Sequence, residues 1–355
     1  MIGISLLTLV PGISGGSETY ARELCRALSR VGTLQYRAFL PAIAADASDG
    51  LPSSVVGRYR ASRTMPGRIA GMSLAAFRPQ PLRRELELDR LDAIHFPLSV
   101  MLPSVDRPAA ATTVADLQHE DNPEFFGRAE LTYRKVVYGW TIRRSQIVIT
   151  ISEHAREALL ERYRLAPDRV RTIYLGVDHD VFTPSDKVSQ GGFLLYPARP
   201  WAHKNHARLF EAFARLRRER PELRFVLTGE GDFGTLPAGV EARGRVSRDE
   251  LVDLYRRAGA LVFPSLYEGF GMPVVEAMAC GCPVACSNAT ALPEIAAGAA
   301  RLFDPRDVDE LAAAVDDVLD EPAPWIARGL DRAKHFTWDV CARAHEEVYR
   351  ELSSA

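Results

Sequence analysis

Apolar and polar residues follow one another along the chain in a pattern that predicts strands alternating with helices. The apolar run Ile2–Leu9 predicts a buried strand, and the amphipathic stretch from Glu18 to Arg30 predicts the helix after it. Later helices are predicted at Ala129–Arg143 and Glu153–Arg162. Further strands are predicted at Tyr36–Leu40, Asp92–Phe96, Ala110–Ala115, Gln146–Ile151 and Val170–Tyr174. This alternation is typical of α/β proteins with a parallel, doubly wound sheet.

The segment Gly176–Gly192 interrupts the alternation. It is rich in Asp, Pro, Ser and Gly, has no apolar periodicity, and is interpreted as a linker between domains. A second alternating set follows it, with strands at Phe193–Pro197, Leu223–Thr228, Leu261–Phe263 and Pro283–Cys286. Because 355 residues exceed one ordinary core, we predict two domains, at 1–182 and 183–336.

The last predicted helix, Trp338–Leu352, lies in the remaining segment, 337–355. We expect this helix to pack back against the N-terminal domain. Its apolar residues are Val340, Ala344, Val348 and Tyr349.

Composition narrows the class of protein. A hydrophobic content of 47% and a charged content of 25% are ordinary for a soluble globular protein. The net charge of −2 argues against nucleic acid as a partner. No apolar run reaches the ~20 residues that a membrane span needs, and Met1–Val10 lacks the basic start of a signal peptide. An odd number of cysteines, five, indicates a reducing compartment, so a cytoplasmic location is expected. The nearby Cys280, Cys282 and Cys286 are interpreted as small core residues and not as a metal site.

Two carboxylates, Glu268 and Glu276, flank the bend Gly269-Phe270-Gly271-Met272-Pro273. The bend follows the predicted strand Leu261–Phe263 and precedes a predicted helix, Val274–Ala279, with the proline at its first position. Free amides at the start of a helix favour an anionic group such as a phosphate. The two carboxylates suit the hydroxyls of a sugar or a ribose.

The basic residues point to the same chemistry. The chain has 40 Arg and only four Lys, so a lysine at position 204 is unusual for this protein. Arg199 ends a predicted strand, where ligands of parallel sheets bind, and Lys204 follows it. A planar guanidinium and a compact ammonium suit a diphosphate, which is the favoured role, and an ordinary solvated loop is the alternative. Gly15 and Gly16, after the first strand, let the backbone approach phosphates closely.

Seven motifs together resemble those of the retaining nucleotide-sugar glycosyltransferases of the group 1, or family 4, type. The resemblance covers nearly the whole chain and implies the GT-B fold, in which two Rossmann-like domains face each other across the active-site cleft. The motifs are Gly15-Gly16, Thr150-Ile151-Ser152-Glu153, Gly176-Val177-Asp178, Arg199-x4-Lys204-Asn205, Thr228-Gly229-Glu230-Gly231, Glu268-x7-Glu276 and Ala277-Met278-Ala279-Cys280-Gly281.

The resemblance implies that a hexose passes from a nucleotide-diphosphate sugar with retention of configuration, without a cofactor or an essential metal. It assigns Arg199 and Lys204 to the diphosphate, Glu276 to the ribose hydroxyls and Glu268 to the donor-sugar hydroxyls. The donor phosphate itself would take the proton of the acceptor. The predicted donor-binding set is completed by Gly15, Gly16, Gly229, Val246, Gly269, Phe270, Gly271, Met272 and Pro273.

One position departs from the family pattern. Many relatives carry a His directly before the Asp of the segment that matches Ala115-Asp116-Leu117-Gln118-His119, and here that position is Ala115. Asp116 or His119 would take over part of its task, although His119 could equally be a surface loop residue. This segment and His203-Lys204-Asn205-His206 are similar to those of mannosyltransferases, so GDP-mannose is the favoured donor, with rhamnose and glucose as other hexoses.

Other interpretations of these motifs stay open. The G-x-G-x-x-G match at Gly229–Gly234 does not lead into a predicted helix, which argues against NAD. Asp178-His179-Asp180 resembles a metal-binding D-x-D but lies in the predicted linker, so we expect a turn and no metal. A glycosidase pair at Glu268 and Glu276 would leave the phosphate features unexplained. A sugar-nucleotide epimerase, a phosphorolytic enzyme of the same fold and a non-catalytic sugar-nucleotide-binding partner subunit are alternatives.

The acceptor is indicated only by one basic segment. Between Arg58 and Arg84 there is no Asp or Glu, which suits peripheral contact with an anionic membrane or a solvated arginine-rich face. The segment carries Arg58, Arg60, Arg63, Arg68, Arg78, Arg83 and Arg84, with apolar Met65, Ile69, Met72, Leu74 and Phe77. A glycan, a lipid-linked sugar or a small natural product would be the acceptor.

Overall fold

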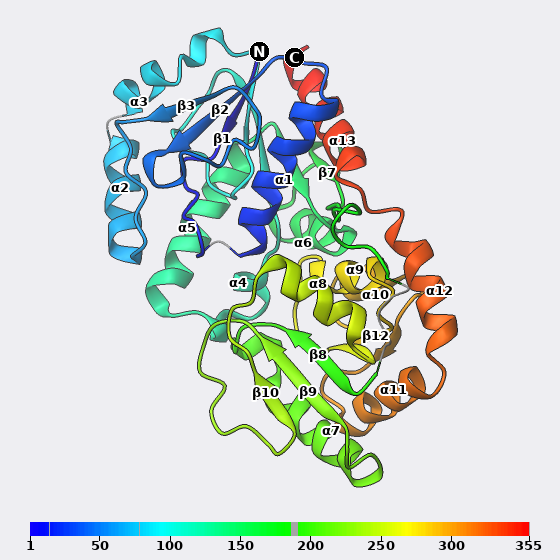
Figure 1. The fold of residues 1–355 in the computed structure, drawn as a ribbon. Helices are drawn as coiled ribbons and strands as arrows, with labels where there is room; N and C mark the ends of the chain where they lie inside the picture. The colour runs from blue at the N-terminus through cyan, green and yellow to red at the C-terminus, as the bar shows by residue number, and fades with distance from the viewer. Residues whose placement is uncertain (14, 78, 186–190, 355) are drawn as a thin grey trace. The chain divides into compact units, whose positions relative to one another are not determined.

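The computed structural model describes residues 1–13, 15–77, 79–185 and 191–354, and within residues 65 and 73–77 only the backbone. The chain divides into two units (Figure 1). Unit 1 comprises Met1–Gly176 together with Trp338–Ala355, and unit 2 comprises Val177–Thr337. The chain therefore leaves unit 1 once and returns to it for its last helix.

Unit 1 contains a seven-stranded parallel sheet, so the predicted alternation of strands and helices is confirmed. In spatial order its strands are β3 (Ser53–Val56), β2 (Tyr36–Pro41), β1 (Ile2–Ser5), β4 (Ala93–Phe96), β5 (Ala109–Val114), β6 (Ile147–Thr150) and β7 (Val170–Thr172). In the register, Ile4 of β1 lies beside Ala38 and His95. The order of the strands reverses between β1 and β4, which makes the carboxyl end of β1 a topological switch point.

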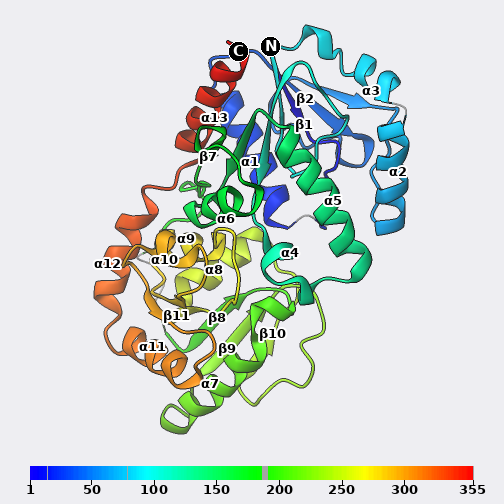
Figure 2. The same ribbon diagram turned by 180° about the vertical axis from the view of Figure 1, so that it is seen from behind.

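The helices of unit 1 cover both faces of this sheet. Right-handed crossovers that run in opposite directions from the switch point place α1 and α5 on opposite faces, as Figures 1 and 2 show. The helices are α1 (Gly16–Val31), α2 (Met65–Phe77), α3 (Pro79–Glu85), α4 (Gln118–Asp121), α5 (Arg128–Arg144), α6 (Glu153–Tyr163) and α13 (Trp338–Ser353).

Helix α13 packs beside α1 and over β4 and β5. The predicted apolar face was partly wrong, because Val340 is 59% exposed while His345 and Glu346 are buried. Both polar side chains are satisfied: His345 Nε2 lies 2.7 Å from the hydroxyl of Tyr20 on α1. The carboxylate of Glu346 accepts four hydrogen bonds, from the backbone N–H groups of Thr33 and Leu34 and from the hydroxyls of Thr33 and Tyr36.

His95 on β4 is buried in the same region. Its Nδ1 lies 2.8 Å from the hydroxyl of Tyr349, and its Nε2 lies 2.8 Å from that of Thr113. These contacts join β4, β5 and α13, so His95 is a structural residue of unit 1.

Unit 2 contains a six-stranded parallel sheet. In spatial order its strands are β10 (Val240–Ala242), β9 (Arg224–Thr228), β8 (Phe193–Pro197), β11 (Ala260–Phe263), β12 (Val284–Ser287) and β13 (Arg301–Phe303). Its helices are α7 (His206–Glu219), α8 (Arg248–Arg257), α9 (Met272–Ala279), α10 (Leu292–Ala296), α11 (Val308–Asp320) and α12 (Pro322–Ala333). The strand order reverses between β8 and β11, which is the switch point of this sheet.

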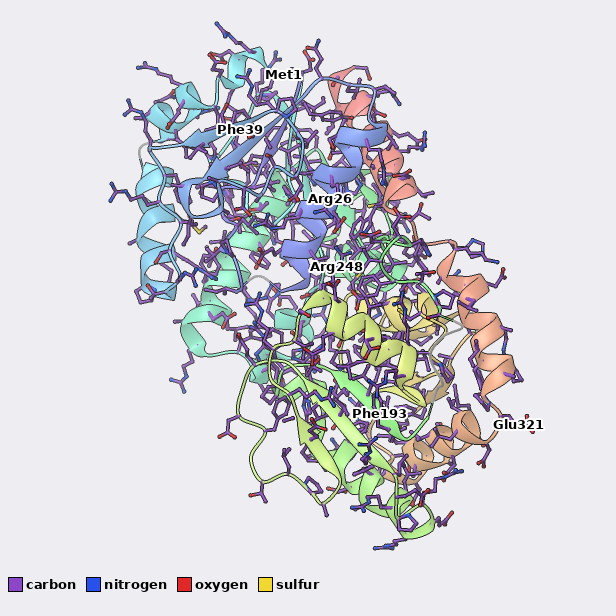
Figure 3. The ribbon with its side chains drawn as sticks, viewed as in Figure 1. Met1, Arg26, Phe39, Phe193, Arg248 and Glu321 are labelled. Atoms are coloured by element: carbon purple, nitrogen blue, oxygen red, sulfur yellow. The ribbon has the colours of Figure 1, made fainter. Side chains whose placement is uncertain are left out.

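Each sheet has its own apolar core. Phe39 on β2 and Phe193 on β8, both labelled in Figure 3, are buried side chains of the two sheets. All five cysteines are free and buried, which confirms the interpretation of Cys280, Cys282 and Cys286 as core residues. Among the described residues, no helix combines the length and the hydrophobicity that crossing a membrane requires.

Several element boundaries differ from the predictions. Strand β1 ends at Ser5, four residues before the predicted end, because the N–H of Leu9 bonds back to the carbonyl of Leu6 and closes a turn. The two domains were predicted to end at residues 182 and 336, whereas the boundaries between the units lie after residues 176 and 337. Within the predicted linker, Val177 forms an isolated parallel bridge with Thr337. Residues 186–190 of the linker lie outside the described residues.

Candidate active site

The predicted donor-binding residues of unit 2 gather at the switch point of its sheet. Arg199 and Lys204 follow β8, and Glu268 follows β11, the adjacent strand. In open α/β sheets, ligands bind outside the carboxyl ends of the strands at this reversal of strand order. The fold of unit 2 therefore places both bases and the carboxylate where such a sheet binds its ligand.

Lys204 and Glu268 form a close ion pair. Lys204 Nζ lies 2.5 Å from Glu268 Oε1, and the two side chains are only 13% and 14% exposed. The ammonium also lies 5.3 Å from the centre of the Phe263 ring, a favourable cation–π position. The pair is thus an internal feature of the site, where charges interact more strongly than at the open surface.

Backbone geometry holds Lys204 in this position. Lys204 ends a short 3₁₀ helix, Ala202–Lys204, and the next residue, Asn205, adopts the left-handed conformation that starts α7. The buried hydroxyl of Tyr196 donates to the carbonyl of Lys204 at 2.9 Å. The Asn205 amide donates to the Pro264 carbonyl at 3.0 Å, and so joins this turn to the end of β11.

Arg199 lies near a carboxylate and an aromatic ring. Its Nη2 is 3.6 Å from Glu230 Oε2, and its guanidinium carbon is 5.6 Å from the ring centre of the exposed Trp201. Gly229 supports this arrangement: it has a φ of +116°, and a Cβ there would lie 3.0 Å from the Ala198 carbonyl carbon. The loop after β9 therefore packs backbone to backbone against the loop that carries Arg199.

The bend after Glu268 has the predicted strand–loop–helix form. Gly271 is the N-cap of α9, with a φ of +100°, and Pro273 is the second helical residue instead of the predicted first. A hydroxyl fixes the backbone of Glu268: Thr290 Oγ1 accepts its N–H at 2.9 Å and donates to its carbonyl at 3.0 Å. At the start of α9, Pro273 has no N–H, and the N–H of Val274 donates to the Gly271 carbonyl at 2.9 Å, so this helix offers fewer free amides to an anion than the sequence predicted.

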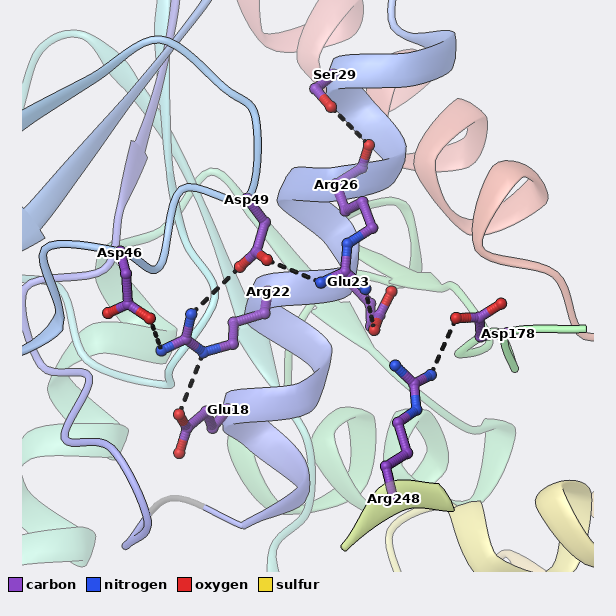
Figure 4. A network of polar contacts seen from close by, with 9 residues as sticks. All are labelled: Glu18, Arg22, Glu23, Arg26, Ser29, Asp46, Asp49, Asp178 and Arg248. Carbon is purple, nitrogen blue, oxygen red and sulfur yellow. Dashed lines mark hydrogen bonds and ion pairs between the residues drawn. The ribbon is translucent and has the colours of Figure 1, made fainter. Parts of the chain in front are cut away.

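Glu276 lies on α9 and is partly buried. Burial raises the pKa of Glu276 to about 6, against the opposing effects of a hydrogen bond from Tyr255 and the charge of Arg248. The Tyr255 hydroxyl donates to Glu276 Oε2 at 2.9 Å. The Tyr255 hydroxyl therefore orients this carboxylate, and Arg248, whose charge acts on it, pairs with Asp178 at 3.0 Å (Figure 4).

Val246 and the segment of Asp178 complete the predicted positions of unit 2. Val246 is partly buried and lies directly before Ser247, the N-cap of α8. Asp178-His179-Asp180 forms a turn in which the N–H of Asp180 bonds to Asp178 Oδ1, as predicted. No helix follows residues 229–234 before β10, as predicted. Within the described part of the chain, no three His, Cys, Asp or Glu side chains form a cluster that could hold a metal.

In unit 1, Gly15 and Gly16 lie at the start of α1, beyond the carboxyl end of β1. Gly15 is the N-cap, with φ 52° and ψ −128°, and Gly16 is the first helical residue. A Cβ at either position would meet nothing within 4 Å, so this backbone is open to an approaching group. The free amides of a 16-residue helix begin here, which is the arrangement predicted for a phosphate.

Charged side chains surround the first turns of α1 and hold the backbone of Gly12. Glu18, in the first turn of α1, accepts the N–H of Gly12 at 2.8 Å and pairs with Arg22 at 3.2 Å. Arg22 also pairs with Asp46 and Asp49, beyond the end of β2 (Figure 4). The network ties Gly12 to α1, and α1 to the loop after β2.

Asp116 and His119 occupy different environments in unit 1. Asp116 is partly exposed, and its Oδ1 accepts the N–H of Gln118 at 3.0 Å. His119 is fully buried, with its ring 5.4 Å from that of Tyr138, and burial lowers its pKa. Among the described residues, neither of its ring nitrogens has a hydrogen-bond partner. His119 is therefore not the surface loop residue of the alternative interpretation, and Asp116 is the more accessible of the two.

Comparison with known proteins identifies the family. Residues 180–328 match the family described as Glycosyl transferases group 1, and residues 14–181 match Glycosyltransferase Family 4. The chain is 30% identical over 269 residues to O-antigen chain mannosyltransferase B of Escherichia coli, which covers 68% of this chain and 70% of that protein. The chain belongs to the group 1, or family 4, glycosyltransferases.

A further relative and two solved structures are similar to this glycosyltransferase. MMP alpha-(1->4)-mannosyltransferase of Mycolicibacterium hassiacum is 33% identical over 220 residues, or 58% of this chain and 54% of that protein. Sucrose-phosphate synthase of Thermosynechococcus elongatus has a TM-score of 0.79 at 20% identity, with 99% of both chains covered. Anabaena HepE in complex with UDP and glucose has a TM-score of 0.73 at 17% identity, with 100% and 99% covered. The predicted GT-B fold class, with two Rossmann-like domains, is confirmed.

Sequence reasoning missed several residues that orient the site of this glycosyltransferase. Thr290 fixes the backbone of Glu268, Tyr255 orients Glu276, and Tyr196 anchors the turn of Lys204. Each lies at least eight residues from its partner along the chain, and none belongs to a motif. No signal in the sequence pairs them, because the contacts arise only when unit 2 folds and brings its helices, turns and strand ends together.

Proposed function

We propose that this glycosyltransferase is a retaining hexosyltransferase that uses a nucleotide-diphosphate sugar and needs no metal. The observation that carries the proposal is the Lys204–Glu268 pair at the switch point of unit 2, with Arg199 on the same loop. One donor molecule would use both charges, since its diphosphate needs a cation and its sugar hydroxyls need an acceptor.

The reaction breaks the bond between the anomeric carbon of the hexose and the diphosphate oxygen. Negative charge develops on the leaving diphosphate, and Lys204 and Arg199 stabilise that charge from fixed positions. Losing one such fixed group typically costs ~10²–10³ in rate. The acceptor hydroxyl forms the new bond on the same face of the sugar, and its proton passes to the departing phosphate oxygen. Because the two bases supply positive charge, the step does not require a metal.

Two carboxylates would bind the rest of the donor. Glu268, held by Lys204 and by the backbone contacts with Thr290, would accept hydrogen bonds from hexose hydroxyls. Glu276, oriented by Tyr255, would accept hydrogen bonds from the ribose hydroxyls. GDP-mannose is the proposed donor, and the two mannosyltransferase relatives support this choice. Because HepE was solved in complex with UDP, a UDP-sugar is the main competing donor. A glycan, a glycolipid or a small natural product is the proposed acceptor.

Thermal unfolding with UDP, GDP, ADP and dTDP, each with and without magnesium, tests the proposal. A ligand at ~100 times its dissociation constant adds about 2.7 kcal/mol to the stability of the folded state, enough for a shift of several degrees. A shift with GDP that is the same without magnesium is the expected result. No shift with any nucleotide would favour the partner-subunit alternative. Consumption of donor in the absence of any acceptor would favour an epimerase.

We also propose that the protein contacts anionic membranes from the cytoplasm through the segment from Arg58 to Arg84. Arg58, Arg60 and Arg63 are exposed, and Ile69 on α2 is an exposed apolar neighbour. Arg78 of this segment lies outside the described residues, as do the side chains of Met65, Leu74 and Phe77. Native protein should co-sediment with liposomes that contain phosphatidylserine, and replacing the three exposed arginines by glutamine should abolish this. Absence of co-sedimentation by the native protein would refute the contact.

A further inference from the structure

Glu230 lies between two arginines at the carboxyl edge of the sheet in unit 2. Its Oε2 is 3.6 Å from Arg199 Nη2, and its Oε1 is 4.0 Å from Arg245 Nη1. The three residues follow three adjacent parallel strands, β8, β9 and β10. One carboxylate therefore serves as the counter-ion of two guanidinium groups beside the switch point.

The backbone around Glu230 fixes the side chain there. Gly229 and Gly231 flank it with φ values of +116° and +140°, and a Cβ at Gly231 would lie 2.5 Å from the Pro200 ring. Two residues without side chains are required for the close packing of the loops, and Glu230 between them carries the side chain that faces Arg199. The Gly229-Glu230-Gly231 segment thus places one negative charge beside Arg199, the residue predicted to bind the diphosphate.

The contacts of Glu230 are of the kind that a better ligand can replace. The Glu230 side chain is 55% exposed and its distances to both arginines are long, whereas Lys204 and Glu268 are close and largely buried. Exposed ion pairs contribute ~0–1 kcal/mol. A diphosphate offers several anionic oxygens, and guanidinium groups bind such oxygens in bidentate pairs that are stronger than a single long contact.

We propose that Glu230 is an exchangeable counter-ion, which a nucleoside diphosphate displaces so that Arg199 and Arg245 both bind the diphosphate. The inference rests on the proposed function, because it takes Arg199 as a diphosphate ligand. It adds Arg245 as a second guanidinium and gives Glu230 two effects. The carboxylate keeps both arginines near the site while the site is empty, and it weakens retention of the nucleoside diphosphate product.

Isothermal titration of UDP, GDP, ADP and dTDP into native protein and two variants tests this role. Glu230→Gln keeps the shape of the side chain and removes the competing charge, so the dissociation constant of the bound nucleotide should fall by about two- to fivefold. Arg245→Gln should raise that constant by a similar factor. Stopped-flow measurement should show slower release of the nucleotide from Glu230→Gln, and the difference should shrink at high salt.

Glu241→Gln is the matched control. Glu241 is also 55% exposed and also pairs with an arginine, Arg243, at 2.8 Å, so the variant makes the same change in net charge in unit 2. Its nucleotide affinity should equal that of the native protein. Native affinity in Glu230→Gln, or weaker binding, would overturn the exchange while leaving the proposed function in place. An unchanged affinity in Arg245→Gln would remove that residue from the site. Failure of the native protein to bind any of the four nucleotides would overturn both proposals.

Discussion

The Lys204–Glu268 pair can be tested as a catalytic device by a double-mutant cycle. Lys204→Met removes the ammonium and keeps most of the stem, and Glu268→Gln removes the carboxylate charge at constant shape. Each single variant leaves the other charge without its partner in a site where the side chains are 13% and 14% exposed. The third member of the cycle, with both substitutions, leaves neither charge.

The structure sets the expected magnitudes. Breaking a fully buried pair costs about 3–5 kcal/mol, and the remaining exposure of this pair reduces the cost to about 2 kcal/mol per single variant. For a unit of this size, that loss lowers the midpoint of thermal unfolding by roughly 4–8 °C. The double variant should recover most of this stability, because no unpaired charge remains. Its turnover should stay low, because each fixed group contributes ~10²–10³ to the rate.

Urea unfolding measures the stability of each variant. The rate at which nucleoside diphosphate forms from the donor measures its turnover. Stability that returns in the double variant without activity is the expected result, and it would show that the pair serves the reaction. Recovery of native turnover in the double variant would mean that the pair only holds the loops together. Independent, additive losses of stability would contradict the close contact itself.

Three further outcomes follow from the same structure. Burial raises the pKa of Glu276 to about 6. The protonated carboxyl therefore adds about 2 kcal/mol to the free energy of unfolding below pH 4.5, which is the ordinary pKa of the group, and this contribution is lost as the pH rises through about 6. Nucleotide affinity should change in the opposite direction, falling below pH ~6 as the ribose-binding carboxylate is protonated. Tyr255→Phe should move this inflection upward, and a pH-independent affinity would refute the ribose role. Glu346→Gln should lower the free energy of unfolding, measured with urea, by about 2 kcal/mol, because the carboxylate accepts four hydrogen bonds. An unchanged midpoint of urea unfolding would contradict that network. Gly271→Ala should destabilise the protein more than Gly298→Ala, because both have positive φ but only the former would place a Cβ 2.6 Å from a leucine methyl; equal losses would exclude the clash.

The strands of the two sheets were largely predictable because buried parallel strands are short apolar runs. Phe193–Pro197 agrees with β8 at both ends. Ile2–Leu9 was too long, since a buried turn is as apolar as the strand before it. The edge strands β3, β10 and β13 were missed because they are only three or four residues long and carry no long apolar run, and β3 and β10 are also mostly exposed.

The site was predictable where residues are close in sequence or carry a family motif. The positions of Arg199, Lys204 and Glu268 follow from strand ends and from the resemblance. The contact between Lys204 and Glu268 spans 64 residues and depends on β8 lying beside β11, which the order of elements alone does not determine. For the same reason the burial of His119 was not predictable, because its neighbour Tyr138 comes from a helix beyond an intervening loop.

The division of the chain has a consequence for its synthesis. Tyr20 on α1 and His95 on β4 are translated early, whereas their partners on α13 follow the whole of residues 177–337. At ribosomal rates of ~5–20 residues per second, that interval lasts roughly 8–32 s. During this time the part of the N-terminal sheet that α13 covers, over β4 and β5, is exposed, and of the contacts described here Tyr20 and His95 have only those with Thr113. Unit 2, by contrast, is continuous and needs no later segment, so it is completed on the ribosome before the unit that precedes it in the chain.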